Sequence, residues 1–334
     1  MKVSLPLMFL KHRSKYAADL LFREAGPGDK QAVLSLRQNV YRGLDYLPDY
    51  YDYFIADRNR KCIIGEMKNK PVVFGVMYAI DGGRSMIGQA GRVHERFERQ
   101  GLFSAMNQFL NAYARSLGCR ARVAMVETTL NMYTRSEKFK QTHTEITSKL
   151  HYAGVITHTV RDSLQHIVSS CDVSADIRTA SPAEIQHLME AEHRREYLFP
   201  NNSMLLDYIP YQSIPENIPL LFNRNVQIFS NVCCEESSPH GLLTAGSNFL
   251  CSHPPESYTI DVFGTDSTQL ENHILFHLHR ALQTTHGEFC LQIFVEKGYM
   301  AQELCNILVK LDIPKCNWYV EGGVAVKSIV EERL

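Results

Sequence analysis

Short apolar runs alternate with amphipathic stretches along most of the chain, a pattern that indicates both strands and helices. The run 20–24 predicts a strand, and Asp29 is a suitable N-cap for the stretch that follows. Apolar residues recur there at helical spacing as far as Tyr41, and Gly43 ends the run, so we expect one amphipathic helix. Pro48 suits a first helical turn and predicts a second helix over 49–56.

Strand-like segments come next. The segments 60–67 and 71–80 flank Lys68-Asn69-Lys70, which predicts a hairpin, and 85–93 predicts a third strand. The stretch 100–117 has the strongest helical pattern of the chain, and Gly118 closes it. Three further elements are expected: a strand at 122–126, a helix at 131–140, and a hairpin within 146–160 that turns at Ala153-Gly154.

The second part of the chain repeats a similar order, after small and polar residues at 169–174 that predict a boundary. The pattern predicts helices at 182–193, 214–222, 266–284 and 299–311, and strands at 176–179, 203–208, 226–230, 242–250, 257–262, 289–295 and near Trp318 and Val324. Two similar halves indicate an internal duplication. We therefore expect a tail (1–18) and two domains (19–168 and 175–334) of the α/β (α+β) class, each a mixed, mostly antiparallel sheet flanked by helices.

Composition and charge indicate which kinds of partner and which cellular compartment to expect. The 334 residues include 35 basic and 36 acidic side chains, a formal charge of −1, so no general field favours nucleic acid or an anionic membrane. The nine cysteines form no CxxC pair, which argues against a zinc ribbon or a disulfide framework and favours a reduced, cytoplasmic setting. The apolar run 3–10 is too short for a secretory signal or a membrane span, so we expect a loose tail and no membrane partner.

The junction between the strand 85–93 and the helix 100–117 is the strongest candidate for a binding site. A loop of this kind, 94–101, leads into the N-terminus of a helix, where free backbone N–H groups can bind a phosphate. Arg96 and Arg99 add positive charge beside it. An ordinary strand-to-helix connection is the alternative.

With this loop, the first half resembles the GCN5-related N-acetyltransferase (GNAT) superfamily, whose fourth strand leads to the loop that holds the coenzyme A pyrophosphate. That loop is usually written Arg/Gln-x-x-Gly-x-Gly/Ala. In the stretch 98–103, Gly101 keeps the central glycine, but Glu98 stands at the basic position and Phe103 at the small one. The second half has no such loop at 263–268, so we expect two GNAT-like halves of which the second is degenerate.

Two further segments resemble histidine N-acetyltransferase and its relatives. Residues 41–48, Tyr-Arg-Gly-Leu-Asp-Tyr-Leu-Pro, are similar to the family's Y-x-G-L-D-Y-L-P segment. Leu198-Phe199-Pro200 and the stretch 207–211 are similar to a segment of its C-terminal domain. The resemblance implies transfer of an acetyl group from acetyl-CoA, without a metal, to the α-amine of a small-molecule acceptor, a free amino acid and first of all L-histidine.

The resemblance also implies which residues meet acetyl-CoA. The backbone of Arg92 and Val93, at the end of the fourth strand, would bind the pantetheine arm, together with the side chain of Asn131. The pyrophosphate would meet the loop and the first turn of the helix: Arg99, Gln100, Gly101, Leu102, Phe103 and Ser104. Glu98 repels a diphosphate unless it points away or pairs with Arg96 or Arg99, so we expect weaker acetyl-CoA binding than in typical relatives.

Candidate residues for the chemistry follow from the same resemblance and from position. Tyr133 is the candidate general acid for the leaving thiolate, with a merely packed ring as the alternative. His94 is a candidate base by position alone, against a surface histidine.

Four residues are candidates for the acceptor site: Asp45, Tyr46, Gln89 and Tyr211. Asp45 can hold an ammonium or imidazole N–H but could equally cap a helix, and Tyr46 could be a core aromatic. Gln89 can orient a substrate but cannot act as a base.

Two alternatives stay open. His273, His277 and His279 lack the glutamate of an HExxH motif, so we expect a polar helix face rather than a metal site. The departures at Gln89, Glu98 and Phe103 favour a second class of function, a degenerate relative that binds or senses a ligand without turnover.

Overall fold

The computed structural model describes residues 20–127, 137–170, 176–222, 225–233, 239–315 and 323–329. The predicted tail, Asn131, Tyr133 and the strand near Trp318 lie outside these residues. The chain folds into two compact units, one holding the described residues up to Val123 together with Ser328 and Ile329, and the other holding the described residues of 124–327. None of the helices in the described ranges is long and apolar enough to cross a membrane.

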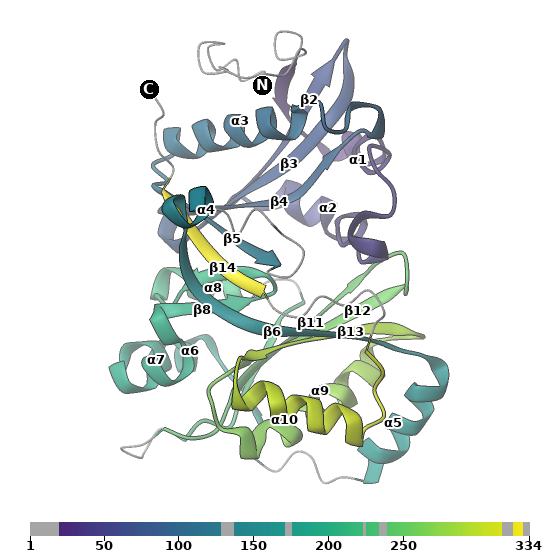
Figure 1. Ribbon diagram of the computed structural model, residues 1–334, viewed down its shortest axis with the longest axis vertical. Coiled ribbons are helices and arrows are strands. Elements are labelled where there is room, and N and C mark those ends of the chain that lie inside the picture. The colour runs from purple at the N-terminus through teal and green to yellow at the C-terminus, as the bar shows by residue number, and fades with distance from the viewer. Residues whose placement is uncertain are drawn as a thin grey trace. The chain divides into compact units, whose positions relative to one another are not determined.

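The first unit is built on a sheet with the strand order β1-β2-β3-β4-β5, in which β4 and β5 are parallel and the other neighbours antiparallel (Figure 1). Its strands are β1 (Leu21–Glu24), β2 (Arg60–Met67), β3 (Lys70–Ile80), β4 (Ser85–Val93) and β5 (Ala121–Glu127). Its helices are α1 (Lys30–Leu34), α2 (Leu47–Ala56) and α3 (Leu102–Ser116), with short 3-10 turns η3 (Pro27–Asp29), η4 (Val40–Gly43), η5 (Asp81–Gly83) and η6 (Glu95–Phe97).

Helices cover both faces of this sheet because successive strand residues point to opposite sides. Phe74 faces α2, where its ring lies 6.2 Å from that of Tyr51. The next residue, Gly75, lies against Met106 of α3, and the missing side chain lets this helix pack closely. Arg92 is the register partner of Phe74, so its side chain lies on the α2 face of the sheet.

The second unit has a sheet with the order β14-β6-β13-β12-β11-β10-β7. Its strands are β6 (Thr144–Ile156), β7 (Arg178–Thr179), β10 (Gln227–Ser230), β11 (Leu243–Leu250), β12 (Glu256–Phe263), β13 (Phe289–Glu296) and β14 (Gly323–Ile329), with a separate hairpin of β8 (Ser203–Leu206) and β9 (Ile209–Gln212). Its helices are α4 (Glu137–Thr142), α5 (His158–Ser170), α6 (Pro182–Glu190), α7 (Glu192–Leu198), α8 (Ile218–Leu221), α9 (Leu270–Thr284) and α10 (Tyr299–Lys310), and its 3-10 turns are η7 (Pro200–Asn202), η8 (Pro215–Asn217) and η9 (Ser267–Gln269).

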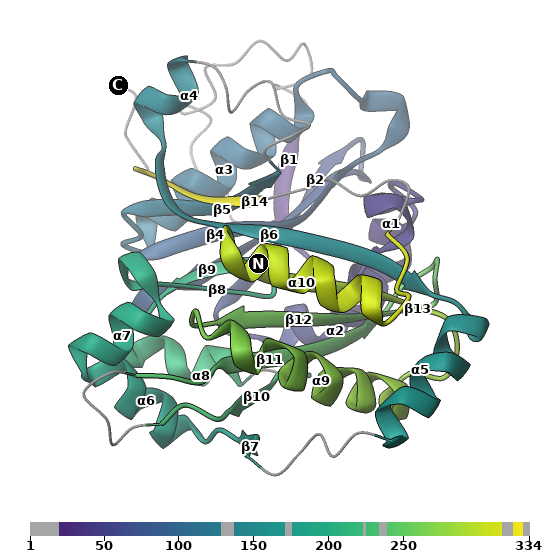
Figure 2. The ribbon, with the colours of Figure 1, turned by 60° about the horizontal axis from the view of Figure 1, so that its bottom comes forward.

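The two units repeat one strand arrangement, as the duplicated pattern predicts. In the second unit β7, β10, β11 and β12 pair antiparallel in succession and β12 pairs parallel with β13, which is the order and sense of β1 to β5. Helices α9 and α10 cover one face of this sheet, and their apolar side chains form a core with Ile260, Leu291 and Ile293 (Figure 2). The predicted α/β class with mixed sheets is confirmed.

The division between the units differs from the predicted domain boundary. It falls at Val123 rather than at 168–175, because β6 pairs with β13 over its last eight residues and so joins the second sheet. The helix α5 that follows β6 packs against α9 in the same unit and was not predicted.

The predicted hairpin at Ala153-Gly154 is wrong, since β6 runs straight through both residues. A Cβ at Gly154 would lie 2.4 Å from the carbonyl oxygen of Pro314, so this glycine allows a close backbone approach instead of a turn. A predicted strand at 203–208 is in fact the β8–β9 hairpin, which turns at Asp207 and Tyr208 with φ of 48° and 63°.

The predicted helix from Asp29 to Tyr41 is also shorter than expected. Helix α1 ends at Leu34, and Asn39, Tyr41 and Arg42 have φ values of 52°, 50° and 58°. Residues in this left-handed region cannot continue a right-handed helix. The chain therefore turns into η4, at the start of the motif 41–48.

Candidate functional site

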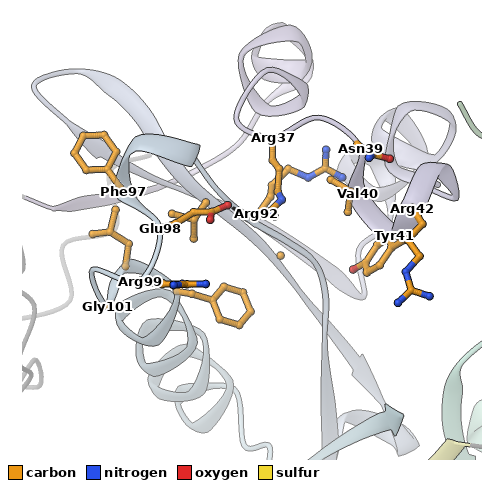
Figure 3. Close-up of a pocket in the computed structure, with 14 residues that line it drawn as sticks. Arg37, Asn39, Val40, Tyr41, Arg42, Arg92, Phe97, Glu98, Arg99 and Gly101 are labelled. Atoms are coloured by element: carbon orange, nitrogen blue, oxygen red, sulfur yellow. Dashed lines mark hydrogen bonds and ion pairs between the residues drawn. The ribbon is translucent and has the colours of Figure 1, made fainter. Parts of the chain in front are cut away.

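A cavity of ≈ 720 Å³ opens in the first unit between the η4 segment and the loop that joins β4 to α3. Figure 3 shows Tyr41 and Arg42 on one side of it and Phe97, Glu98 and Arg99 on the other. Four arginines line it against one glutamate, so the cavity favours an anion. Its lining residues are Arg37, Asn39, Val40, Tyr41, Arg42, Gly91, Arg92, Val93, Phe97, Glu98, Arg99, Gly101, Leu102 and Phe103.

Strand β4 carries a bulge at the edge of this cavity. Phe74 of β3 pairs with Arg92 and Val76 pairs with Gln89, so Ala90 and Gly91 together face the single residue Gly75. On its other side β4 pairs with β5 over Ser85–Ile87. In the described register the backbone of 88–93 therefore has no strand partner on that side. This stretch includes Arg92 and Val93, which are predicted to hold the pantetheine arm.

The loop after β4 presents the N-terminus of α3 to the cavity. Gly101 is its N-cap, with φ of 84°, and no side chain caps the helix. The N–H groups of Leu102, Phe103 and Ser104 have no acceptor within the helix, because the first helical bond is that of Ala105 to Gly101. A phosphate group fits this position.

Glu98 has a partner that the sequence did not predict. Its carboxylate forms an ion pair with Arg37 from the segment between α1 and η4, rather than with Arg96 or Arg99. Arg37 thus supplies the counter-charge for Glu98 at the cavity wall.

Phe103, the second departure from the family loop, is accommodated by a glycine. The half-exposed Phe103 ring lies over Gly91, where a Cβ would be 2.5 Å from the ring carbon Cε2. The large residue at the usually small position is therefore matched by the absence of a side chain on β4.

The motif 41–48 is joined to the bulge of β4 by two contacts. Arg92 Nη2 donates a hydrogen bond to Asp45 Oδ1 at 2.8 Å, and the side chains are 1% and 12% exposed. The backbone N–H of Ala90 donates to the Tyr46 hydroxyl at 3.0 Å. Asp45 also accepts from the N–H of Leu47, so it helps to start α2.

Gln89 and Tyr46 lie in an aromatic cluster on the α2 face. The Tyr46 ring stacks on Tyr41 at 5.8 Å and meets Phe54 edge-on, and Gln89 Oε1 accepts a hydrogen bond from Arg60 at 3.2 Å. Arg60 is buried over the ring of Tyr78, and its ion pair is with Asp57. The acceptor roles of Asp45, Tyr46 and Gln89 remain predictions, and the structure brings these three residues to the same end of β4.

The remaining candidates are more scattered. His94 Nδ1 accepts the N–H of Arg96 at 3.2 Å, and its role as a base stays a prediction. Gln100 donates to the carbonyl of Arg96. Tyr211 is buried within the second unit, beside Met204 in the β8–β9 hairpin.

A polar cluster in the second unit was missed by the sequence analysis. Lys149, His151, Asp261 and Gln292 lie on the sheet face opposite α9 and α10, and Tyr208 donates to Gln292 at 2.5 Å. Burial raises the pKa of Asp261 to about 7 and lowers that of His151 to about 4. The sequence did contain a signal for this cluster, because Asp261 is a charged residue within the apolar strand run 260–263.

The histidine pair of α9 is internal rather than a polar face. His273 and His277 are both buried and share the hydroxyl of Thr244, at 2.9 Å from each ring. The described residues contain no group of three or more His, Cys, Asp or Glu side chains that could hold a metal ion.

The family comparison matches the second half of the chain. The family model for the C-terminal part of histidine N-acetyltransferase covers residues 174–296. Histidine N-acetyltransferase from Scomber australasicus is 22% identical over 339 aligned residues, which cover 94% of this chain and 95% of the relative.

Solved structures agree on the fold. A tandem GNAT protein from the clavulanic acid biosynthesis pathway matches with a TM-score of 0.54 at 12% identity, over 94% of this chain and all of its own length (100%). The N-myristoyltransferase of Saccharomyces cerevisiae, solved with myristoyl-CoA, matches with a TM-score of 0.54 at 9% identity, over 98% and 83% of the two chains. The chain is therefore similar to histidine N-acetyltransferase over nearly its whole length and has a two-half GNAT fold, as the motifs 41–48 and 98–103 predict.

Proposed function

We propose that this protein transfers the acetyl group of acetyl-CoA to the α-amine of a free amino acid, with L-histidine as the first acceptor to test. The observation that carries the proposal is the convergence, on one cavity, of the β4 bulge, the uncapped N-terminus of α3 and the motif 41–48. We choose L-histidine as the first acceptor because the similar protein from Scomber australasicus is named histidine N-acetyltransferase.

Different parts of the cavity would bind different groups of acetyl-CoA. The N–H groups of 102–104 would bind the pyrophosphate, and Arg99 beside them would add a positive charge. The pantetheine arm would pair with the backbone of Arg92 and Val93, as a strand pairs with its neighbour. The acetyl group would then lie near Ala90 and Gly91.

The reaction needs a neutral amine and a proton for the departing thiolate. The amine nitrogen attacks the thioester carbonyl carbon, the carbon–sulfur bond of the tetrahedral intermediate breaks, and the departing thiolate takes up a proton. The α-amine must be neutral to attack, so a water or a weak base takes its proton. Holding the two reactants together supplies much of the rate. Tyr133, outside the described residues, is the proposed proton donor to the thiolate.

The departures from the family loop do not argue against turnover. Glu98 is paired with Arg37 and Phe103 is matched by Gly91, so each departure comes with a compensating residue. This supports a working enzyme over a binding module.

A panel of free amino acids tests the proposal. Purified protein with acetyl-CoA should release thiol fastest with one amino acid, expected to be L-histidine, and mass spectrometry should find the acetyl group on its α-nitrogen. Silence with every amino acid, despite CoA binding measured by calorimetry, would overturn the acetyltransferase proposal.

A further inference from the structure

Arg92 has more hydrogen-bonding capacity than its partner uses. The residue is 2% exposed, and its Nη2 donates to Asp45. Its Nε and Nη1 atoms have no hydrogen-bond partner among the described residues. Nη1 carries two N–H groups and Nε one, and leaving such donors unpaired in a buried site is costly. The arrangement is therefore incomplete without an acceptor.

The missing acceptor belongs in the cavity. Arg92 is one of its lining residues, and Figure 3 places Arg92 between Glu98 on one side and Val40 and Tyr41 on the other. Arg92 directly follows Gly91, the second residue of the bulge in β4. A buried guanidinium with free N–H groups is suited to a carboxylate or a phosphate oxygen.

We propose that the Arg92 side chain binds the α-carboxylate of the acceptor amino acid. The proposal rests on the proposed function and adds to it the group that selects a free amino acid. The amine nitrogen of an α-amino acid is bonded to the carbon next to the carboxylate. A carboxylate fixed at Arg92 therefore places the α-amine beside Ala90 and Gly91, and keeps amines that lack a carboxylate from being held there. Asp45 is a positioning residue that fixes the guanidinium from the other side.

The other source of an anion is the phosphate groups of CoA, and two features favour the carboxylate. The uncapped N-terminus of α3 and Arg99 already form a phosphate site on the other wall. In addition, Asp45 neutralises the charge of Arg92, so the pair offers donors without net charge. Such a pair suits a single negative charge better than a diphosphate, which Asp45 would repel.

Acceptor analogues test this on the unaltered protein. L-histidine should have a kcat/KM roughly 10- to 100-fold above that of histamine, L-histidinamide and L-histidine methyl ester, since each analogue lacks the charged hydrogen-bond acceptor. If another amino acid proves to be the substrate, its own amine, amide and ester take their place. Equal rates with and without the carboxylate would overturn the inference about Arg92 and leave the acetyltransferase proposal intact. No thiol release with any amino acid would instead overturn the acetyltransferase proposal.

A double variant tests whether Arg92 is the residue that binds the carboxylate. Arg92→Met with Asp45→Asn removes both charges, so that neither is left buried alone. The histidine-to-histamine ratio should fall toward one, while the dissociation constant of CoA by calorimetry should change by less than about 3-fold. A large loss of CoA affinity with the ratio retained would assign Arg92 to the phosphates instead.

The first unit offers a matched control. Arg23 and Asp29 form a second arginine–aspartate pair, which is partly buried, and neither lines the cavity. Arg23→Met with Asp29→Asn should lower stability and leave the histidine-to-histamine ratio as it was. A fall of the ratio in the control as large as in the Arg92 variant would show a general structural effect and contradict the assignment.

Discussion

The Tyr46 hydroxyl accepts a hydrogen bond from the backbone N–H of Ala90 at 3.0 Å, which ties the motif 41–48 to the bulge of β4. Ala90 has a φ of 50°, an uncommon conformation for a residue with a side chain, and such conformations persist where the surroundings hold them. The motif therefore has a structural task at the bulge, whether or not Tyr46 also meets the acceptor.

Replacing Tyr46 by phenylalanine should loosen the bulge. The variant leaves the Ala90 N–H without its partner, so we expect a loss of about 1–2 kcal/mol in the free energy of unfolding, together with a lower kcat/KM. Urea denaturation and steady-state rates measure the two effects. Tyr53→Phe is the control, because Tyr53 packs in the same cluster through its ring and should lose little by either measure. Equal effects of the two variants would assign Tyr46 to general packing.

The Arg37–Glu98 pair predicts opposite effects of its two members on CoA affinity. Glu98→Gln removes a negative charge beside the expected diphosphate and releases Arg37, so CoA should bind roughly 2- to 5-fold tighter. Arg37→Gln leaves Glu98 unpaired and should weaken binding by a similar factor. Both changes should shrink in 0.5 M salt, where charges are screened. Calorimetry at low and high salt decides, and changes of the same sign would refute the electrostatic account.

The contact of Gly91 with Phe103 predicts a rescue. Gly91→Ala places a Cβ 2.5 Å from the Phe103 ring and should cost about 1–3 kcal/mol of stability by overpacking. Phe103→Ala in the same chain should recover most of the loss. Gly28→Ala is the control, since its Cβ would have nothing within 4 Å and should change stability by less than about 0.5 kcal/mol. A double variant as unstable as Gly91→Ala alone would mean that β4 itself cannot take a side chain there.

Much of this architecture follows from local pattern. The strands at 60–67 and 85–93 and the helix at 102–116 match the prediction within two residues, because each has a clear period and a glycine or polar turn at its end. The order of elements and the loop 98–103 then identify the fold. The same reasoning missed α5, and it gave Gly154 a turn where close packing needs the glycine.

The partners of the site residues could not be predicted in the same way. Arg37 is 61 positions from Glu98 and Asp45 is 47 from Arg92, and nothing in a single sequence pairs residues at such separations. The motif 41–48 marks Asp45 as special, but only the fold shows that its carboxylate faces β4 instead of open solvent.

Buried histidines predict how stability changes with pH. Burial lowers the pKa of His273 from 6.5 to about 4, so the native state keeps this ring neutral where the unfolded chain takes up a proton. Its contribution to stability is complete above pH 6.5 and is lost as the pH falls toward 4. Between these values the free energy of unfolding should fall more steeply in the wild type than in His273→Gln, by up to about 1.4 kcal/mol per pH unit.

The comparison of wild type and variant separates His273 from Asp261, whose raised pKa acts in the opposite direction over the same range and cancels in the difference. Urea unfolding at several pH values from 4.5 to 7.5 gives the slopes. Parallel slopes for His273→Gln and the wild type would mean that the native protein protonates His273 as readily as the unfolded chain does, contrary to its burial against Thr244 and Asn231.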